Sequence, residues 1–343
     1  MADRGVVLSE PGRVALEEIG VDAPGPGEVL VRIHATGVCH SDLHVIEENG
    51  WGHPFPVLLG HEGAGTIEAL GAGVEGLAAG DRVVLGWKTA CGECGPCRRG
   101  EPRFCKKPPL APGRLHRADG TDLTAVLRTG TFSTRTVVPA VAAVKVPDEL
   151  PAEQACLIGC AVATGVMSAL ETAKVWEGAR VAVIGCGAVG LSVIQGARIA
   201  GAGEIRAIDL DERKLEQAMR FGATATGEGP VDFAFDVVGR RSTFELAVSL
   251  LASGGTVVLI GLSPSGETAE LSLPGLFAKR ARILVSHGGD HVAQQDFPRL
   301  AQWAIEGKLD LAGMVTRTGS LEQWNDAFDA MREGDVIRTV LTP

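Results

Sequence analysis

The feature that most restricts the fold of this chain is a glycine-rich loop between a buried strand and a helix. The run Arg180–Ile184 is apolar and rich in β-branched residues, as in a strand buried on both faces. The loop Gly185-Cys186-Gly187-Ala188-Val189-Gly190 follows it, and apolar periodicity over 191–199 predicts a helix. Glycines at this spacing allow a tight turn and a close approach of pyrophosphate to the backbone. The motif therefore predicts a βαβ unit that binds a dinucleotide at Gly185, Gly187 and Gly190.

Strands and helices alternate after this loop, which predicts a doubly wound parallel sheet of the α/β class. Further strands are expected at 204–209, 233–238, 256–260 and 283–286, with helices at 211–221 and 242–251. Before residue 151, short apolar runs at 28–33, 65–70 and 81–85 indicate a compact β-rich domain. Beyond 291, amphipathic helices at 297–306 and 321–331 precede a strand at 336–341, and we expect this tail to return to the first domain. The expected domains are thus 1–155 with 291–343, and 156–290.

The choice of dinucleotide is predicted from Asp209. This residue ends the strand after the glycine loop, 19 residues beyond Gly190. A carboxylate there accepts hydrogen bonds from a ribose diol and repels a 2′-phosphate, which favours NAD over NADP. An ordinary carboxylate at a strand end is the alternative.

Four cysteines lie close together at spacings of 3, 3 and 8 residues: Cys91, Cys94, Cys97 and Cys105. Glycines and prolines between them allow tight folding, and four thiolates can close a tetrahedral shell around zinc. Because no position stays open for a substrate, the role of such a zinc is structural. An iron–sulfur cluster, or two disulfides in an oxidising compartment, would use the same residues.

A second set of potential metal ligands is spread along the chain. Cys39 follows Gly37 by two residues, and His61 lies between Gly60 and Gly63. A cysteine far along the chain can supply a third ligand. Three such ligands leave the fourth position of zinc open for water or substrate. Spacing alone does not select Cys160 over Cys156 as the third ligand, and buried cysteines are also common as small apolar core residues.

Composition excludes several classes of protein. The 343 residues include 32 Lys and Arg against 42 Asp and Glu, so the net charge of −10 argues against a nucleic-acid partner. No uncharged stretch reaches the ~20 residues that span a bilayer, and the N-terminal residues lack the pattern of a signal peptide. Eight cysteines are too few for a disulfide scaffold of this length. We expect a cytoplasmic protein with neither a membrane nor a nucleic-acid partner.

Together these motifs resemble the medium-chain, zinc-containing alcohol dehydrogenase family over essentially the whole chain. The features that match are Gly60-His61-Glu62, the four cysteines, Cys160 followed by Thr164-Gly165, the glycine loop, Asp209 and the closing segment 336–340. The resemblance implies a β-rich, GroES-like catalytic domain and a Rossmann coenzyme domain. It also implies two zinc ions per chain, one catalytic and one structural, and hydride transfer between an alcohol or aldehyde and NAD(H).

The same resemblance implies individual roles. Cys39, His61 and Cys160 would hold the catalytic zinc, with Glu62 as an alternative ligand. Asp42 would orient His61, Ser41 would contact the substrate oxygen, and His44 would be the outer member of a proton relay through the nicotinamide ribose. The implied cofactor contacts are His40 and Arg338 to the phosphates, Thr164 and Val189 beside the nicotinamide, and Lys214 at the adenosine ribose.

The sequence says less about the identity of the substrate than about the metal and cofactor sites. Trp51 and Trp87 match positions that line the alcohol pocket of the family, but indoles at such positions can also be core residues. No arginine can be assigned to a substrate carboxylate, although Arg114, Arg117 and Arg128 lie in the long segment after Cys105. The segment 286–290 is similar to the glutathione- or mycothiol-related branch, which leaves a dehydrogenase of thiol–formaldehyde adducts open.

Two further alternatives are a biosynthetic reductase of C=N or C=C bonds and a non-catalytic nucleotide sensor. The intact metal ligands and the Ser41/His44 pair argue against both. The length of the segment after Cys105 favours a homodimer over a tetramer.

Overall fold

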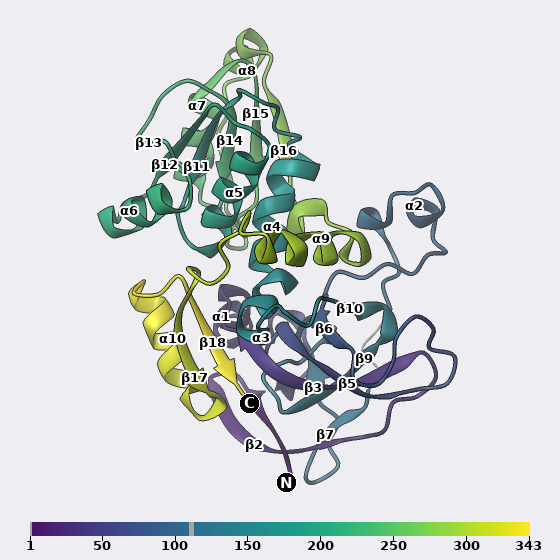
Figure 1. Ribbon diagram of the computed structural model, residues 1–343. Coiled ribbons are helices and arrows are strands. Elements are labelled where there is room, and N and C mark those ends of the chain that lie inside the picture. The colour runs from purple at the N-terminus through teal and green to yellow at the C-terminus, as the bar shows by residue number, and fades with distance from the viewer. Residues whose placement is uncertain (1, 110–112) are drawn as a thin grey trace. The chain divides into compact units, whose positions relative to one another are not determined.

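The computed structural model describes residues 2–109 and 113–343, which form two compact units (Figure 1). Unit 1 comprises Met1–Cys160 and Val292–Pro343, and unit 2 comprises Ala161–His291. The expected domain boundaries lie within a few residues of these positions.

Unit 2 contains a six-stranded parallel sheet in the order β13-β12-β11-β14-β15-β16. The strands are β11 (Arg180–Ile184), β12 (Glu204–Ile208), β13 (Ala225–Thr226), β14 (Val231–Asp236), β15 (Leu251–Leu259) and β16 (Arg282–Val285). Because the chain runs outward from β11 in one direction and then returns to β14 on its other side, the sheet is doubly wound, and the predicted fold class is confirmed.

The helices of unit 2 precede, connect or follow these strands. They are α4 (Ala161–Met167), a π-helical turn (Ser168–Thr172), α5 (Ala188–Ile199), α6 (Glu212–Arg220), α7 (Arg241–Ser249), α8 (Leu273–Lys279) and the short turn η7 (Gly288–Asp290). Buried residues from the sheet and α7 form one core cluster, in which Ala182, Ala234 and Val257 are fully buried. Such small residues on the central strands allow helices to pack closely on the sheet.

Unit 1 contains two sheets. One has the order β7-β2-β1-β4-β8, and the other has the order β10-β6-β5-β3-β18-β17, with β9 paired to β3. The strands are β1 (Asp3–Glu10), β2 (Arg13–Val21), β3 (Glu28–Gly37), β4 (Val57–Leu58), β5 (Glu62–Leu70), β6 (Arg82–Leu85), β7 (Leu115–Arg117), β8 (Thr124–Ala125), β9 (Arg135–Pro139), β10 (Ala143–Lys145), β17 (Val315–Ser320) and β18 (Arg338–Thr342). The C-terminal strand β18 thus pairs with β3, near the start of the chain.

Short helices and turns complete unit 1. They are α1 (His40–Glu47), η1 (Asn49–Gly52), α2 (Gly95–Arg98), η2 (Pro102–Phe104), η3 (Val126–Arg128), η4 (Ala140–Ala142), α3 (Ala152–Ala155), η5 (Cys156–Gly159), α9 (Ala293–Ile305), η8 (Leu321–Gln323) and α10 (Trp324–Glu333). The helix predicted at 297–306 begins earlier, at Ala293, where the Asp296 carboxylate accepts the N–H of Val292 at 2.7 Å. The helix predicted at 321–331 is divided into η8 and α10.

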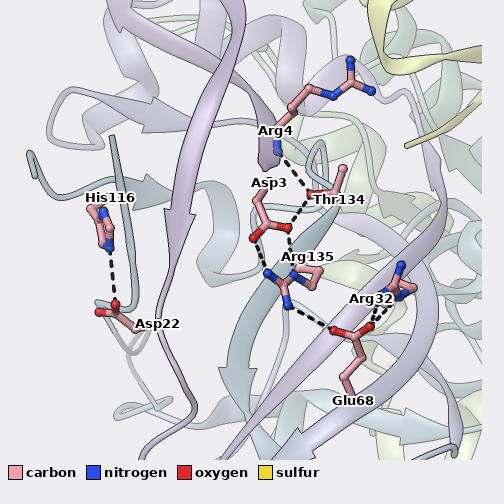
Figure 2. A network of polar contacts seen from close by, with 8 residues as sticks. All are labelled: Asp3, Arg4, Asp22, Arg32, Glu68, His116, Thr134 and Arg135. Atoms are coloured by element: carbon pink, nitrogen blue, oxygen red, sulfur yellow. Dashed lines mark hydrogen bonds and ion pairs between the residues drawn. The ribbon is translucent and has the colours of Figure 1, made fainter. Parts of the chain in front are cut away.

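A network of polar side chains ties the first strand to the second sheet of unit 1 (Figure 2). Arg135 on β9 donates to both oxygens of Asp3 on β1, at 2.8 and 2.5 Å. Thr134 also donates to Asp3 at 2.8 Å, and Arg135 further pairs with Glu68 on β5 at 3.4 Å. The Asp3 side chain is only 11% exposed, so these are partly desolvated, charge-assisted bonds.

Membrane-spanning helices are distinguished by length and hydropathy, and only helices of 18 residues or more qualify by length. No single helix in the described chain is both long and apolar enough to cross a membrane, and only the bent pair 152–159 with 161–172 reaches the required length and composition.

Candidate active site

The pairing of β3 with β5 brings the first potential metal ligands together. Gly37, the last residue of β3, pairs with Glu62, the first residue of β5, so Cys39 and His61 both lie just beyond this pair. The N–H of Val38 donates to the carbonyl of Thr339 on β18 at 2.9 Å, which fixes the chain just before Cys39. The register of three strands therefore positions a thiol and an imidazole next to each other.

Cys160 completes this set. It follows the turn η5, which packs on β5, and it lies with Cys39, His61 and Glu62 so that one potential ligand atom of each is within 4.8 Å of the others. All four side chains are buried. Cys156, the alternative from the sequence, has its Sγ 3.4 Å from the carbonyl of Glu153. The structure therefore brings Cys160 into the set.

His61 is oriented by Asp42. The Nδ1 of His61 lies 3.2 Å from the Asp42 Oδ1 and 3.1 Å from its Oδ2, while the N–H of Gly60 donates to the Asp42 Oδ1 at 2.9 Å. The Nε2 of His61 is buried and has no hydrogen-bond partner in the described part of the chain. A carboxylate on Nδ1 leaves Nε2 as the basic, metal-binding nitrogen.

The backbone conformation at residue 60 requires glycine. Its φ is +90°, and a Cβ there would lie 2.3 Å from the backbone nitrogen of Phe132. Only glycine fits this left-handed, crowded position, and it places His61 at the start of β5.

Glu62 is held by Arg338. The Nη2 of Arg338 lies 3.2 Å from the Glu62 Oε1, and the Nη1 of Arg338 donates to the carbonyl of Val38 at 2.7 Å. The Arg338 side chain is only 4% exposed. The sequence did not indicate this pair, because the two residues are brought together by the pairing of β18 with β3. The expected contact of Arg338 with a cofactor phosphate stays a prediction.

The electrostatics of this buried set suit a cation. The hydrogen bond from Cys160 lowers the pKa of the Cys39 thiol, and the charges of Arg338 and His61 lower it further. Burial raises the pKa of Glu62 to about 7 against the opposing charge of Arg338. Two thiols, one imidazole nitrogen without a partner and a carboxylate form the donor set of an open zinc site, so these residues fit a zinc ion.

The four cysteines of the loop after β6 form a second set with ligand atoms within 4.8 Å of one another. The Sγ of Cys94 lies 3.4 Å from that of Cys97 and 3.9 Å from that of Cys105, and the Cys105 Sγ lies 3.6 Å from the Cys91 Sγ. Zinc–sulfur bonds of ~2.3 Å in a tetrahedron give sulfur–sulfur separations of roughly 3.8 Å. These separations are too long for disulfides and fit one zinc ion.

Backbone N–H groups also face these sulfurs. The N–H of Cys91 donates to the Cys105 Sγ at 3.3 Å and that of Cys94 to the Cys91 Sγ at 3.4 Å. Backbone N–H groups of Cys97 and Lys106 lower the pKa of Cys94 to about 6. Such N–H donors favour the thiolate, which is the form that binds metal.

In unit 2, the glycine loop joins β11 to α5. Gly185 has a φ of +93°, and a Cβ on Gly190 would lie 1.9 Å from the Gly185 carbonyl, so the loop packs as tightly as its sequence predicted. Helix α5 begins at Ala188 and leaves its first N–H groups pointing out of the loop. The N-terminus of this helix is therefore suited to a pyrophosphate.

Asp209 is fixed next to this loop. Its Oδ2 accepts the N–H of Cys186 at 2.7 Å, and its Oδ1 accepts the N–H of Asp211 at 3.0 Å. Burial raises the pKa of the Cys186 thiol to about 12, with the charge of Asp209 adding to this and that of Lys214 opposing it. Asp209 therefore lies against the glycine loop, and Lys214 lies on α6. Thr164 lies in α4, and its carbonyl accepts the Ser168 hydroxyl at 2.6 Å.

The remaining predicted residues lie on or after α1 in unit 1. The Oγ of Ser41 lies 3.8 Å from the Cys39 Sγ, next to the open metal site. The Nδ1 of His44 lies 2.8 Å from the Glu48 Oε1, and the ring of His44 is 6.3 Å from that of Trp51. Trp51 is 37% exposed, so it is not a core residue. His40 is exposed, and Trp87 is half-buried after β6.

Two family models match the sequence, the alcohol dehydrogenase GroES-like domain over residues 25–148 and the zinc-binding dehydrogenase over residues 188–306. The S-(hydroxymethyl)glutathione dehydrogenase of Escherichia coli O1:K1 / APEC is 37% identical over 368 aligned positions, which cover 99% of this chain and 100% of that relative. The chain belongs to the zinc-containing alcohol dehydrogenase family. It is therefore an oxidoreductase of the class that works with zinc and a nicotinamide dinucleotide.

Solved structures of the family agree with this fold. The chain is 32% identical to an alcohol dehydrogenase zinc-binding domain protein from Burkholderia ambifaria, with a TM-score of 0.95 and coverage of 100% of this chain and 99% of the other. It is 28% identical to benzyl alcohol dehydrogenase from Acinetobacter calcoaceticus, with a TM-score of 0.92 and the same coverage. The expected combination of a GroES-like domain and a Rossmann domain is confirmed.

Proposed function

We propose that this protein oxidises a primary alcohol, or reduces the corresponding aldehyde, with NAD(H) as the hydride carrier. The observation that carries the proposal is the buried set of Cys39, His61 and Cys160, in which Asp42 fixes the nitrogen that His61 presents. A zinc ion held by these three residues would supply a Lewis acid that lowers the pKa of an alcohol hydroxyl. The four cysteines Cys91, Cys94, Cys97 and Cys105 would hold a second, structural zinc.

Side chains of unit 1 would then handle the proton. Ser41 lies beside Cys39, so its hydroxyl can accept the proton of the substrate hydroxyl and hold its oxygen in place. His44 is 37% exposed, so its ring can pass a proton on to water. Glu62 pairs with Arg338 through its Oε1, and one of its oxygens lies within 4.8 Å of the other potential ligand atoms, so it would serve as an alternative ligand.

The cofactor would be NAD. In unit 2, Gly185, Gly187 and Gly190 leave room for a pyrophosphate at the start of α5, and the carboxylate of Asp209 next to this loop would accept the ribose hydroxyls. Lys214 would contact the same ribose, and Thr164 and Val189 would flank the nicotinamide. In unit 1, His40 and Arg338 would contact its phosphates.

A second candidate is the oxidation of a thiol–formaldehyde adduct, which is the reaction named for the 37% identical Escherichia coli relative. Both candidates use the same metal and cofactor sites and differ in what the substrate carries beyond its hydroxymethyl group. The deciding experiment follows NADH absorbance with purified protein and a panel of primary alcohols, aldehydes and thiol–formaldehyde adducts. Activity only on C=C or C=N substrates would contradict both candidates.

We further propose a homodimer in a reducing, cytoplasmic compartment. β16 is the last strand of the six-stranded sheet, and its side chains Ile283 and Val285 are 44% and 66% exposed. Phe277 on α8, which packs on β15, is 84% exposed. An apolar, unpaired strand edge of this kind is suited to pairing with a second copy, and light scattering of Val285→Lys against the unmodified protein would test it. None of the eight cysteines forms a disulfide, which supports the proposal of a reducing compartment.

A further inference from the structure

A row of three polar side chains follows one face of helix α1. Ser41 and His44 lie three residues apart on this helix, and Glu48 caps it four residues after His44, spacings at which side chains share a helix face. The Oγ of Ser41 lies 3.8 Å from the Cys39 Sγ. The side chains of His44 and Glu48 are 37% and 47% exposed. The row therefore leads from the open metal site to the surface of unit 1.

The last two side chains of this row are in direct contact. The Nδ1 of His44 lies 2.8 Å from the Glu48 Oε1, which is the length of a charge-assisted hydrogen bond. An ionised carboxylate only accepts hydrogen bonds, so the proton of this bond must lie on Nδ1. In the neutral ring, Nε2 is then the nitrogen that can accept a proton. Glu48 therefore selects the tautomer of His44.

Backbone hydrogen bonds hold Glu48 in place on both sides. Its N–H donates to the carbonyl of His44 at 2.8 Å, and its carbonyl accepts the N–H of Trp51 at 3.0 Å. All four residues of the turn 49–52 have φ values between +49° and +80°, a left-handed conformation that is costly for the two of them that are not glycine. The turn places the Trp51 ring 6.3 Å from the ring of His44. The imidazole thus lies between a carboxylate and an indole.

We propose that Glu48 is a positioning residue for proton release: it holds the proton on Nδ1 of His44, which leaves Nε2 to receive the proton that the substrate loses. This inference rests on the proposed function and adds a residue to the path of that proton. When Nε2 gains the proton, the ring carries one proton on each nitrogen, and the negative charge of Glu48 offsets its positive charge. Nε2 then loses the proton to water, and the neutral ring with its proton on Nδ1 is restored.

A surface ion pair without a role in the reaction is the competing explanation. Exposed pairs four residues apart on a helix contribute little to stability. The neighbouring Glu47 offers a matched comparison, because its Oε1 lies 3.3 Å from the Nη2 of Arg332 on α10 and its side chain is similarly exposed. If Glu48 only supports the end of α1, Glu48→Ala and Glu47→Ala should have the same small effects.

The first experiment determines the tautomer of His44 by NMR of its ring nitrogens, under mildly alkaline conditions. The signals are assigned by their absence from His44→Gln. In the unmodified protein and in Glu47→Ala, the proton should lie on Nδ1. In Glu48→Ala it should move largely to Nε2, because nothing then holds it on Nδ1. A proton that stays on Nδ1 in Glu48→Ala, or that lies on Nε2 in the unmodified protein, would overturn the inference.

The second experiment measures the oxidation of a primary alcohol. Glu48→Ala should lower kcat by about 3- to 10-fold, with KM and zinc content nearly unchanged, because fewer molecules present Nε2 as an acceptor. Glu47→Ala should keep the kcat of the unmodified protein. Since Glu48 acts through His44, Glu48→Ala should cause no further loss in the background of His44→Gln. An equal loss in both backgrounds would show that Glu48 acts by another route and would contradict the inference.

The two experiments also separate this inference from the proposed function. If the tautomer shifts in Glu48→Ala but no alcohol or aldehyde reacts, the proposed function fails and the orientation of His44 by Glu48 stands. If alcohols are oxidised and Glu48→Ala changes neither the tautomer nor kcat, the inference is wrong and the proposed function stands. A shifted tautomer with an unchanged kcat would mean that proton release does not depend on the tautomer of His44, which also contradicts the inference.

Discussion

The Nδ1 of His61 lies 3.1 Å from the Oδ2 of Asp42, and both side chains are fully buried. The same carboxylate accepts the N–H of Gly60, so one aspartate fixes both the ring of His61 and the backbone before it. The orientation of a metal ligand and the start of β5 therefore depend on the same residue.

Replacement of Asp42 by Asn should weaken zinc binding at the open site. An amide carries no negative charge and has one acceptor oxygen in place of two, so it holds the N–H groups of Gly60 and His61 more weakly, and the basicity of His61 Nε2 should fall. We expect about 10- to 100-fold weaker retention of one of the two zinc ions. Competition with a chromophoric chelator measures this directly, and the other zinc should stay bound. Unchanged retention of both ions would contradict the role given to Asp42.

Replacement of Asp209 by Gly should shift the choice of dinucleotide toward NADP. The carboxylate at the glycine loop repels a 2′-phosphate, and its removal also frees the N–H groups of Cys186 and Asp211. The ratio of kcat/KM for NADP and NAD should rise by at least about 10-fold, and binding titrations should move in the same direction. Asp211→Asn is the control, since Asp211 caps α6 through the N–H of Arg213. A preference for NADP in the unmodified protein would show that the prediction from Asp209 is wrong.

Loss of the Ser41 hydroxyl should lower kcat more than loss of the His44 imidazole. Ser41→Ala removes the hydroxyl beside the open metal site and should lower kcat by about 10²- to 10⁴-fold. His44→Gln removes only the exchange of the proton with solvent, so the loss should be smaller and added imidazole should partly restore the rate. Zinc content and NAD binding should persist in both variants. Equal losses that imidazole does not relieve would mean that the proton leaves by another route.

The network of Asp3 and Arg135 should make stability depend on pH. Burial raises the pKa of Asp3, but hydrogen bonds from Arg135 and Thr134 outweigh it, so the pKa is lowered from its ordinary value of 3.8. The Asp3 carboxyl thus binds a proton less readily in the native state than in the unfolded chain. The ionised Asp3 therefore stabilises the native state fully above pH 4, and this stabilisation is lost as the pH falls through the lowered pKa.

Urea unfolding of Asp3→Asn tests this contribution. We expect the free energy of unfolding to fall by about 1–2 kcal/mol at pH 7, and the difference from the unmodified protein to shrink below pH 4. The control is Glu10→Gln, because the Glu10–Arg13 pair is 61% and 75% exposed and should contribute little. A difference that is the same at pH 3 and pH 7 would exclude an ionic origin.

Much of the fold follows from patterns within short segments of sequence. The strand Arg180–Ile184 has the predicted bounds, because a continuous apolar run and a following glycine define both ends. Helix α8 and the short strand β13 have no comparable signal: α8 has no buried residue, and β13 has only two residues. Packing and pairing in three dimensions form these elements.

The candidate site likewise contains relationships that short segments of sequence do not encode. Glycine-flanked motifs identified Cys39 and His61, but the residues alone did not decide between Cys156 and Cys160, because that choice depends on how the turn η5 approaches β5. The pair of Glu62 and Arg338 depends on the alignment of β18 with β3, and no local pattern encodes it.

The central claim is that Cys39, His61 and Cys160 hold a catalytic zinc separate from the structural one. The most direct measurement is the zinc content of Cys39→Ala, with Cys156→Ala as the matched control for a buried thiol outside the ligand set. The unmodified protein and Cys156→Ala should each hold two zinc ions per chain. Cys39→Ala should hold one, keep its circular dichroism spectrum and lose alcohol oxidation. Two zinc ions retained in Cys39→Ala, or one lost from Cys156→Ala instead, would contradict the claim.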